Sequence, residues 1–231
     1  MNPKFENPMR HFHRVVLYCA LLLAVVAGCA GYRGGWKSVA YIGNTPPEPT
    51  ADDGAASFAS ARSMLRVPGL RLEIALDNQL RTYDTQVYLF ALPLSVDPRE
   101  VYPRNNQEGK TRLFVTVTPS DPSFVFRPTE AVLSVASNRF AGAAGFEFGM
   151  WDREGKRVRE GGSWNHRPVG QEFALVEAGR SYYLSIDFNA PVPSPESPEI
   201  AVDLSRALAS QRHQSIPLIR FAPTRWKEGY T

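Results

Sequence analysis

A serine and a histidine placed close together could act as a nucleophile and its general base, which is the chemistry of a serine hydrolase. Ser163 and His166 lie three residues apart in the stretch GGSWNH. Glycines flank only one side of the serine, and the surrounding pattern predicts no strand-to-helix turn that would present its hydroxyl. We therefore interpret both as loop residues and keep a hydrolase as an alternative.

Ligands for a metal ion are also few in this sequence. Asp77, Asn78 and Asp84 could offer oxygen ligands to calcium, but no glycine-centred loop of ligand spacing accompanies them, and such residues are common in turns. Past residue 30 the chain has two histidines, His166 and His213, and no cysteine. Zinc sites draw three or four ligands mainly from these two residue types. The sequence therefore predicts no metal, no cofactor and a fold without disulfides.

Cys29 is the remaining candidate for chemistry, because it ends an apolar and uncharged segment that spans residues 15–30. At ~1.5 Å per residue, a segment of roughly sixteen residues forms a helix of only about 24 Å, which is short for a hydrocarbon core of about 30 Å. Arg10 and Arg14 precede the segment and small residues end it, as in an export signal. The pattern predicts a signal peptide over residues 1–28.

The residues before this cysteine resemble the lipobox of bacterial lipoproteins. A lipobox has an aliphatic residue, two small residues and a cysteine, and here it reads Val26-Ala27-Gly28-Cys29. The resemblance implies that the Cys29 thiol receives diacylglycerol, that cleavage makes Cys29 the first residue, and that acyl chains hold the protein on a membrane. Ala30 stands where the inner-membrane retention signal of this family has aspartate, which implies an outer-membrane protein that faces the periplasm.

The net charge limits the partners of the exported chain. Residues 1–28 carry a formal charge of +2, so their loss lowers the charge of the chain from +3 to +1. A near-neutral chain lacks the basic surface that nucleic-acid binding requires. We therefore expect two partners, a membrane reached through acyl chains on Cys29 and an envelope protein, and no nucleic acid.

The composition of the chain changes at residue 69. Residues 29–68 are rich in Gly, Ala, Ser, Pro and Thr and lack a sustained apolar face, which is typical of a flexible tether. A tether of about forty residues has a reach of roughly 35 Å. Residues 69–231 contain strand patterns and turn clusters without a repeat or a low-complexity block, and they predict one folded domain.

Strand patterns dominate this predicted domain. Residues 70–77 alternate apolar and polar side chains, which is typical of a half-buried strand, and residues 85–94 are apolar on both faces, which favours a central strand. One short helix is predicted over residues 203–210. Many short strands with so little helix predict an all-β antiparallel sandwich. Further strands are predicted at residues 112–118, 123–126, 131–136, 146–151, 172–176, 182–188, 200–204 and 216–221.

One local motif narrows the predicted fold. Val176, Gly179 and Tyr182 follow one another at steps of three in the stretch VEAGRSYYLSIDF. This order is similar to the tyrosine corner of fibronectin type III and related immunoglobulin-like domains, in which the tyrosine hydroxyl bonds to the backbone of the corner. The resemblance implies an immunoglobulin-like antiparallel β-sandwich, preceded here by the signal peptide and the flexible tether.

Three aromatic residues, Trp164, Trp226 and Tyr230, lie in polar stretches that a sandwich core is not expected to reach. Exposed aromatic residues beside arginine are favoured contacts in protein interfaces, so we predict that these three contact a partner. We expect a non-enzymatic binding or scaffolding component of the cell envelope. One alternative is the anchoring lipoprotein of a type VI secretion system, because QVYLFAL is similar to an early strand of that family; the other is a lipid-anchored hydrolase.

Overall fold

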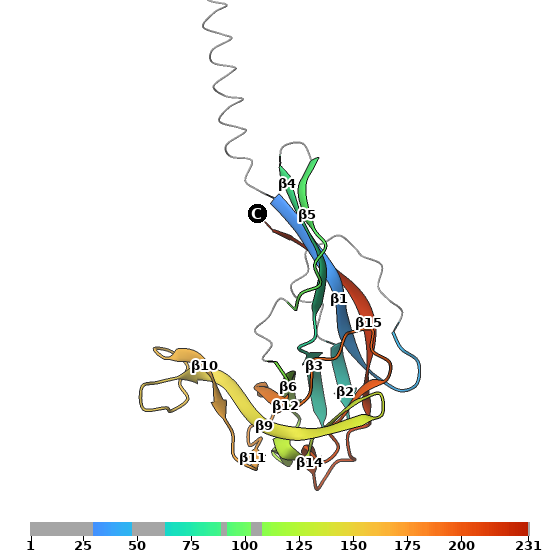
Figure 1. Cartoon of the computed structure of the whole chain (residues 1–231). Coiled ribbons are helices and arrows are strands. Elements are labelled where there is room, and N and C mark those ends of the chain that lie inside the picture. Colours follow the sequence, from blue (N-terminus) through green and yellow to red (C-terminus); the bar gives the residue numbers. More distant parts are fainter. Residues whose placement is uncertain (1–29, 48–62, 89–91, 103–107, 231) are drawn as a thin grey trace, which may run out of the picture.

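The strands of this chain form two antiparallel layers that share one long strand (Figure 1). The computed structural model describes residues 30–47, 63–88, 92–102 and 108–230, with the backbone alone at residues 30, 63, 87, 88, 92–95 and 230. The first layer has the order β5 (Leu92–Asp97), β4 (Leu80–Tyr88), β1 (Ala30–Ile42), β15 (Ile219–Tyr230), β13 (Ile200–Asp203), β8 (Val132–Val135), β9 (Asn138–Trp151). The second has the order β2 (Ser63–Val67), β3 (Leu70–Leu76), β6 (Thr111–Pro119), β12 (Tyr182–Phe188), β9, β10 (Ser163–Pro168).

β9 is the strand that passes from one layer into the other, and it curves across the lower part of the molecule in Figure 1. Its first residues, 138–141, pair with β8, whereas residues 142–148 pair with β12. At the bend, Gly142 lies against the short 3-10 helix η1 (Pro128–Glu130), and a Cβ on Gly142 would come within 2.0 Å of the Pro128 carbonyl oxygen. Glycine therefore allows the bend to close onto η1.

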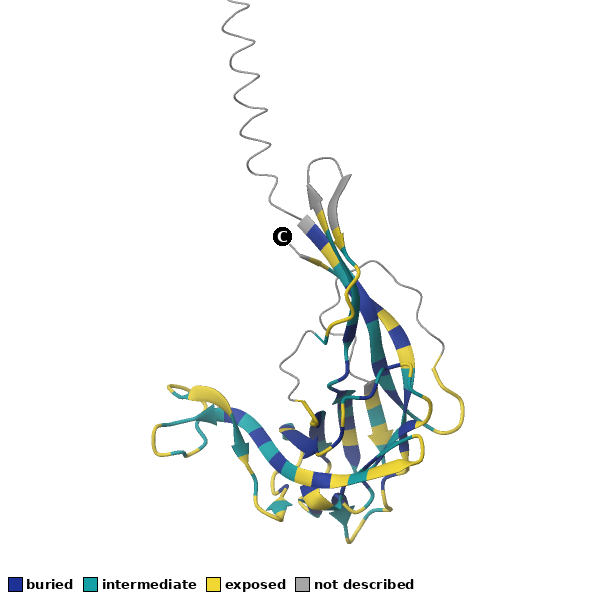
Figure 2. Cartoon of the chain, viewed as in Figure 1, coloured by how far each residue is buried: buried dark blue, intermediate teal, exposed yellow. Residues whose placement is uncertain are grey.

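The core lies between the two layers, and Figure 2 shows buried and more exposed residues alternating along their strands. In β3, Leu70, Leu72, Ile74 and Leu76 are buried, as the period of two predicts. A small third sheet, in the order β11 (Phe173–Ala174), β7 (Phe124–Phe126), β14 (Leu208–Ser210), adds the fully buried Phe124 and Phe126 to the core. The prediction of an all-β antiparallel sandwich is confirmed.

Two predictions about individual elements are wrong. Residues 203–210 are not a helix, because Asp203 Oδ1 accepts a hydrogen bond from the Ser205 amide at 2.9 Å, and the turn leads into β14, which pairs with β7. Residues 85–94 are not one central strand. They run from the end of β4 into β5, the edge strand, and Val87 pairs with Pro93 across the hairpin. Proline has no amide hydrogen to donate, so an edge strand tolerates it better than a central one.

The predicted tether over residues 29–68 is also wrong for most of the residues that the structure describes. β1 begins at Ala30 and pairs with β15 from Gly31 to Ile42 on one side, and with β4 on the other. β2 pairs with β3. The buried positions of β1 include Gly34, Gly35, Ser38 and Ala40, and such small residues leave no apolar stripe in the sequence that would reveal a strand. Residues 48–62 lie outside the described part of the chain.

The predicted tyrosine corner is present. The hydroxyl of Tyr182 accepts a hydrogen bond from the Glu177 amide at 2.9 Å, and the Tyr182 side chain is almost fully buried. Gly179 has a φ of +74°, a conformation that favours glycine, and its amide donates to the Pro119 carbonyl. Val176 differs from the expectation, because its side chain is exposed and the preceding Leu175 enters the core instead.

Replacing Tyr182 with phenylalanine is expected to lower the free energy of unfolding by about 1–3 kcal/mol, because the Glu177 amide then loses its partner. The neighbouring Tyr183 is 41% exposed, so Tyr183→Phe provides a matched control with a smaller loss. Urea unfolding of both variants measures the difference. Equal midpoints, or a larger loss for Tyr183→Phe, would contradict a structural role of the corner hydroxyl.

Candidate functional site

Aromatic side chains gather on the outer side of the second layer. Phe114 of β6, Phe148 of β9, Trp164 and His166 of β10, and Tyr183 of β12 make up this group, which we call the aromatic face. The strand register brings them together, because Phe148 lies opposite His166 on one side and opposite Tyr183 on the other. Residues directly opposite each other in a sheet share a face. Segments far apart in the chain therefore build one surface.

Ring stacking orders the aromatic face. The ring of Trp164 stacks on Phe148 with 5.3 Å between centroids, and the His166 ring lies 4.8 Å from the same phenylalanine. Trp164 is nevertheless 60% exposed and Tyr183 41% exposed. The Trp164 ring is thus held in place by its neighbour while much of its surface, like that of Tyr183, faces solvent. Large aromatic side chains that lose little freedom on contact are favoured anchors in protein interfaces.

The charges beside the aromatic face are paired. Arg112 donates from Nε and from one terminal nitrogen to the two carboxylate oxygens of Asp187, at 2.5 and 2.8 Å, and its guanidinium lies 5.2 Å from the centroid of the Phe146 ring. The carboxylate raises the pKa of Arg112. Burial, followed by the positive charge of Arg112, lowers the pKa of His166. His166 is therefore neutral at pH 7, and the aromatic face is a largely uncharged surface.

The geometry does not support Ser163 and His166 as a nucleophile and its base. Both belong to β10, not to a loop, and residues three apart on a strand point to opposite faces of the sheet. Ser163 lies opposite Trp151, whereas His166 packs between Phe114 and Phe148. The imidazole Nδ1 is buried and has no hydrogen-bond partner within the described residues. His166 thus contributes its imidazole ring to the packing of the aromatic face.

Of the three predicted contact residues, Trp164 is exposed and belongs to the aromatic face. The expectation that Trp226 lies outside the core is wrong, because it is only 8% exposed and its indole Nε1 donates to the Leu80 carbonyl at 3.2 Å. Trp226 pairs with Gly35, where a Cβ would come within 2.0 Å of this same Leu80 carbonyl oxygen, so glycine leaves room for the carbonyl that the indole binds. The backbone of Tyr230 pairs with Gly31, and the structure describes only the backbone of this residue.

Asn78 and Asp84, two of the candidate calcium ligands, and the second histidine, His213, form contacts that stabilise the fold. Asn78 is buried and donates to the Ser38 hydroxyl at 2.9 Å, and Asp84 binds Arg81 at 2.8 Å. His213 Nε2 lies 2.5 Å from the Asp121 carboxylate and its ring stacks on Phe124. Within the described ranges no group of three or more His, Cys, Asp or Glu residues is placed to hold a metal ion.

The end of the first layer where β1 begins is a second candidate region. We call it the anchor ribbon: residues 30–34 of β1, 83–88 of β4, all of β5, and 227–230 of β15. Cys29 lies outside the described residues, directly before this ribbon. The described part of the chain contains no helix with the length and apolar character needed to cross a membrane.

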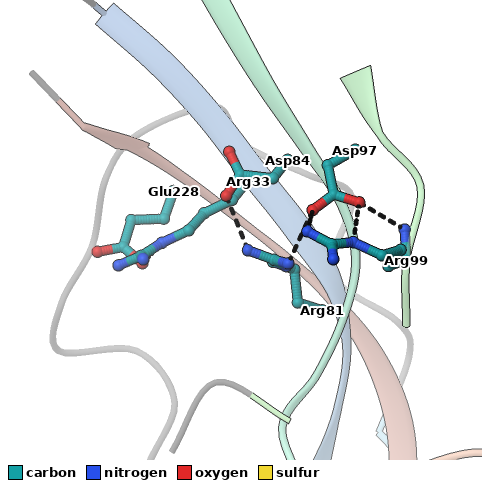
Figure 3. A network of polar contacts seen from close by, with 6 residues as sticks. All are labelled: Arg33, Arg81, Asp84, Asp97, Arg99 and Glu228. Atoms are coloured by element: carbon teal, nitrogen blue, oxygen red, sulfur yellow. Dashed lines mark hydrogen bonds and ion pairs between the residues drawn. The ribbon is translucent and has the colours of Figure 1, made fainter. Parts of the chain in front are cut away.

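A network of ion pairs covers one side of the anchor ribbon (Figure 3). Arg81 binds both Asp84, at 2.8 Å, and Asp97, at 3.3 Å, and Arg99 bonds to Asp97 through two side-chain nitrogens, each at 2.8 Å. The hydrogen bonds from Arg99 lower the pKa of Asp97 to about 2, so this carboxylate stays ionised at neutral pH. The network ties β4 to β5 and to the residues that follow β5.

Sequence reasoning identified Trp164 but missed Phe114, Phe148 and Tyr183 as surface residues. The sequence carried a signal for Phe114, because this residue alternates along β6 with the buried Leu113 and Val115. Phe114 therefore lies on the opposite side of the strand, together with Arg112 and Thr116. Comparisons with protein-family models, with curated proteins and with solved structures find no match to this chain. The residues themselves therefore carry the functional inference.

Proposed function

We propose that this chain is a lipoprotein of the bacterial outer membrane that is anchored through acyl chains on Cys29, faces the periplasm and binds an envelope protein without catalysis. The lipobox Val26-Ala27-Gly28-Cys29 supports the anchor. The single observation that carries the binding role is the exposure of Trp164, 60%, on a ring stack that holds it in place.

The aromatic face supports a protein partner in particular. Its rings are apolar and its histidine is neutral at pH 7, while the bonded pair Arg112–Asp187 stands beside it. An apolar centre with polar residues at its rim is the usual composition of a protein interface. The positions of Ser163 and His166 on opposite faces of β10 give no support to the alternative of a hydrolase.

Changing Cys29 to serine is expected to abolish lipid attachment, because the hydroxyl does not replace the thiol that receives diacylglycerol in this family. The wild-type protein should fractionate with the outer membrane, and its intact mass should correspond to a chain that begins at Cys29 and carries acyl groups. The variant should lack the acyl mass. A mature wild-type chain that begins elsewhere, without acyl groups, would show that the anchor is not at Cys29.

The binding role is tested by a photo-crosslinking amino acid at position 164 in the intact envelope. We expect a discrete crosslinked product with one envelope protein, and its loss when Tyr183→Ala is added, because Tyr183 lies on the same face, opposite Phe148. The same crosslinker at Val176, which is 62% exposed and outside the aromatic face, is the control. The same products from both positions, or no product from position 164, would contradict the proposal.

A further inference from the structure

The two sides of the anchor ribbon differ in chemistry. Arg33, Asp84, Asp97 and Glu228 lie in register across the four strands, and they carry ion pairs of the network in Figure 3. Successive residues of a strand point to opposite sides. The other side therefore carries the next set in register, which is Tyr32, Thr85, Val96 and Gly229. One side of the ribbon carries these ion pairs, whereas the set in register on the other side is uncharged.

The side that carries Tyr32 and Val96 holds exposed apolar surface. Tyr32 is 47% exposed and Val96 is 59% exposed. Lys227 joins them, with its ammonium 5.2 Å from the centroid of the Tyr32 ring. Tyrosine at the level of the lipid headgroups, with a lysine beside it, is a combination enriched at membrane–water interfaces.

The sequence that joins β4 to β5 is also free of charge. The chain has no charged residue from Thr85 to Val96, and the eight residues 87–94 read VYLFALPL. β4 and β5 pair as far as Tyr88 and Leu92, so the backbone brings both ends of this run to the tip of the ribbon. In Figure 1 the paired ends of β4 and β5 lie at one end of the molecule, together with the start of β1 and the C-terminus.

The absence of a tether places this tip beside the proposed lipid. Ala30 is already part of β1 and pairs with Val87 of β4, and Cys29 is its direct neighbour in the chain. Consecutive Cα atoms are about 3.8 Å apart, so acyl chains on Cys29 would hold the hairpin within a few residues' length of the headgroups. A tether of forty residues would have left the ribbon free of the bilayer.

We propose that the end of the anchor ribbon, through Tyr32, Val96 and Lys227, contacts the interfacial region of the phospholipid bilayer. This inference rests on the proposed lipid anchor at Cys29. The interface accommodates the exposed side chains of Tyr32 and Val96, and its anionic headgroups attract the Lys227 ammonium. The acyl chains and the hairpin are then two contacts with one surface, which fixes the orientation of the sandwich and directs its other end into the periplasm.

The experiment uses the acylated protein, reconstituted into vesicles of phosphatidylethanolamine and phosphatidylglycerol. Because Cys29 is acylated and Cys19 is removed with the signal peptide, Val96→Cys introduces the only free thiol for an environment-sensitive fluorophore. Val176→Cys, at an exposed residue that follows β11 at the opposite end of the molecule, is the matched control. We expect a blue shift at position 96 and quenching by spin-labelled lipid, and neither change at position 176.

The outcomes separate the two proposals. Co-flotation of the labelled protein with the vesicles measures the anchor, and fluorescence measures the contact of the hairpin. Protein that floats while position 96 responds like position 176 overturns the inference and leaves the anchor intact. A shift at position 96 that needs a second protein, and not lipid, overturns it as well. Protein that carries no acyl mass and does not float overturns the anchor, and the inference with it.

Discussion

A chain that lacks residues 1–68 is expected to lose the native fold. β1 lies between β15 and β4 in the first layer and pairs with β15 along the whole stretch from Gly31 to Ile42. Its removal leaves the backbone groups of two neighbouring strands unpaired and uncovers Phe221, which lies opposite Ala40. Uncovering one such side chain costs about 1.5–3 kcal/mol, and the total stability of a domain is about 5–15 kcal/mol.

The matched control for this truncation is a chain that lacks only residues 1–29. It keeps β1 and β2 and should unfold cooperatively on heating, with the strand-rich circular dichroism of the folded protein. The chain that begins at residue 69 should show no cooperative transition. If both chains gave the same transition, β1 would be dispensable, and the domain boundary that the composition predicts at residue 69 would be correct.

Replacing Glu147 with alanine is expected to lower the free energy of unfolding by about 2–4 kcal/mol, because it removes one partner of a buried ion pair. The Glu147 side chain is only 6% exposed and forms ion pairs with Arg157 and, at 3.7 Å, with Arg180. Arg157 belongs to the connection between β9 and β10, and Arg180 to the corner before β12. Without the carboxylate, two guanidinium groups face each other. Both arginines are partly exposed, which keeps the loss below that of a fully buried pair.

The control for this effect is Glu177→Ala. Glu177 also forms an ion pair with Arg180, but its side chain is 56% exposed. Exposed ion pairs contribute at most about 1 kcal/mol, so this variant should unfold close to the wild type. Urea unfolding followed by circular dichroism compares the two variants. A loss at Glu177 that equals or exceeds the loss at Glu147 would contradict the buried carboxylate as the group that holds the β9–β10 hairpin.

Alternation of apolar and polar side chains was sufficient to predict many of the strands. Tyr182–Phe188 and Leu70–Leu76 follow the predicted ranges closely, since a strand with one face in a core must place apolar residues at every second position. The tyrosine corner was predictable for a similar reason, because its spacing and its glycine are local properties of the chain. These features depend on residues that are close in sequence.

Features that depend on strand pairing were not predictable in this way. β1 buries glycine, serine and alanine, whose burial is due to β15 and β4 and not to their own hydropathy. Trp226 stands in a polar stretch and is buried where the register places it opposite Gly35 and its indole bonds to the Leu80 carbonyl, both far away in the chain. The aromatic face likewise joins four strands. A local pattern records which side chains avoid water, whereas register between distant strands determines which of them meet.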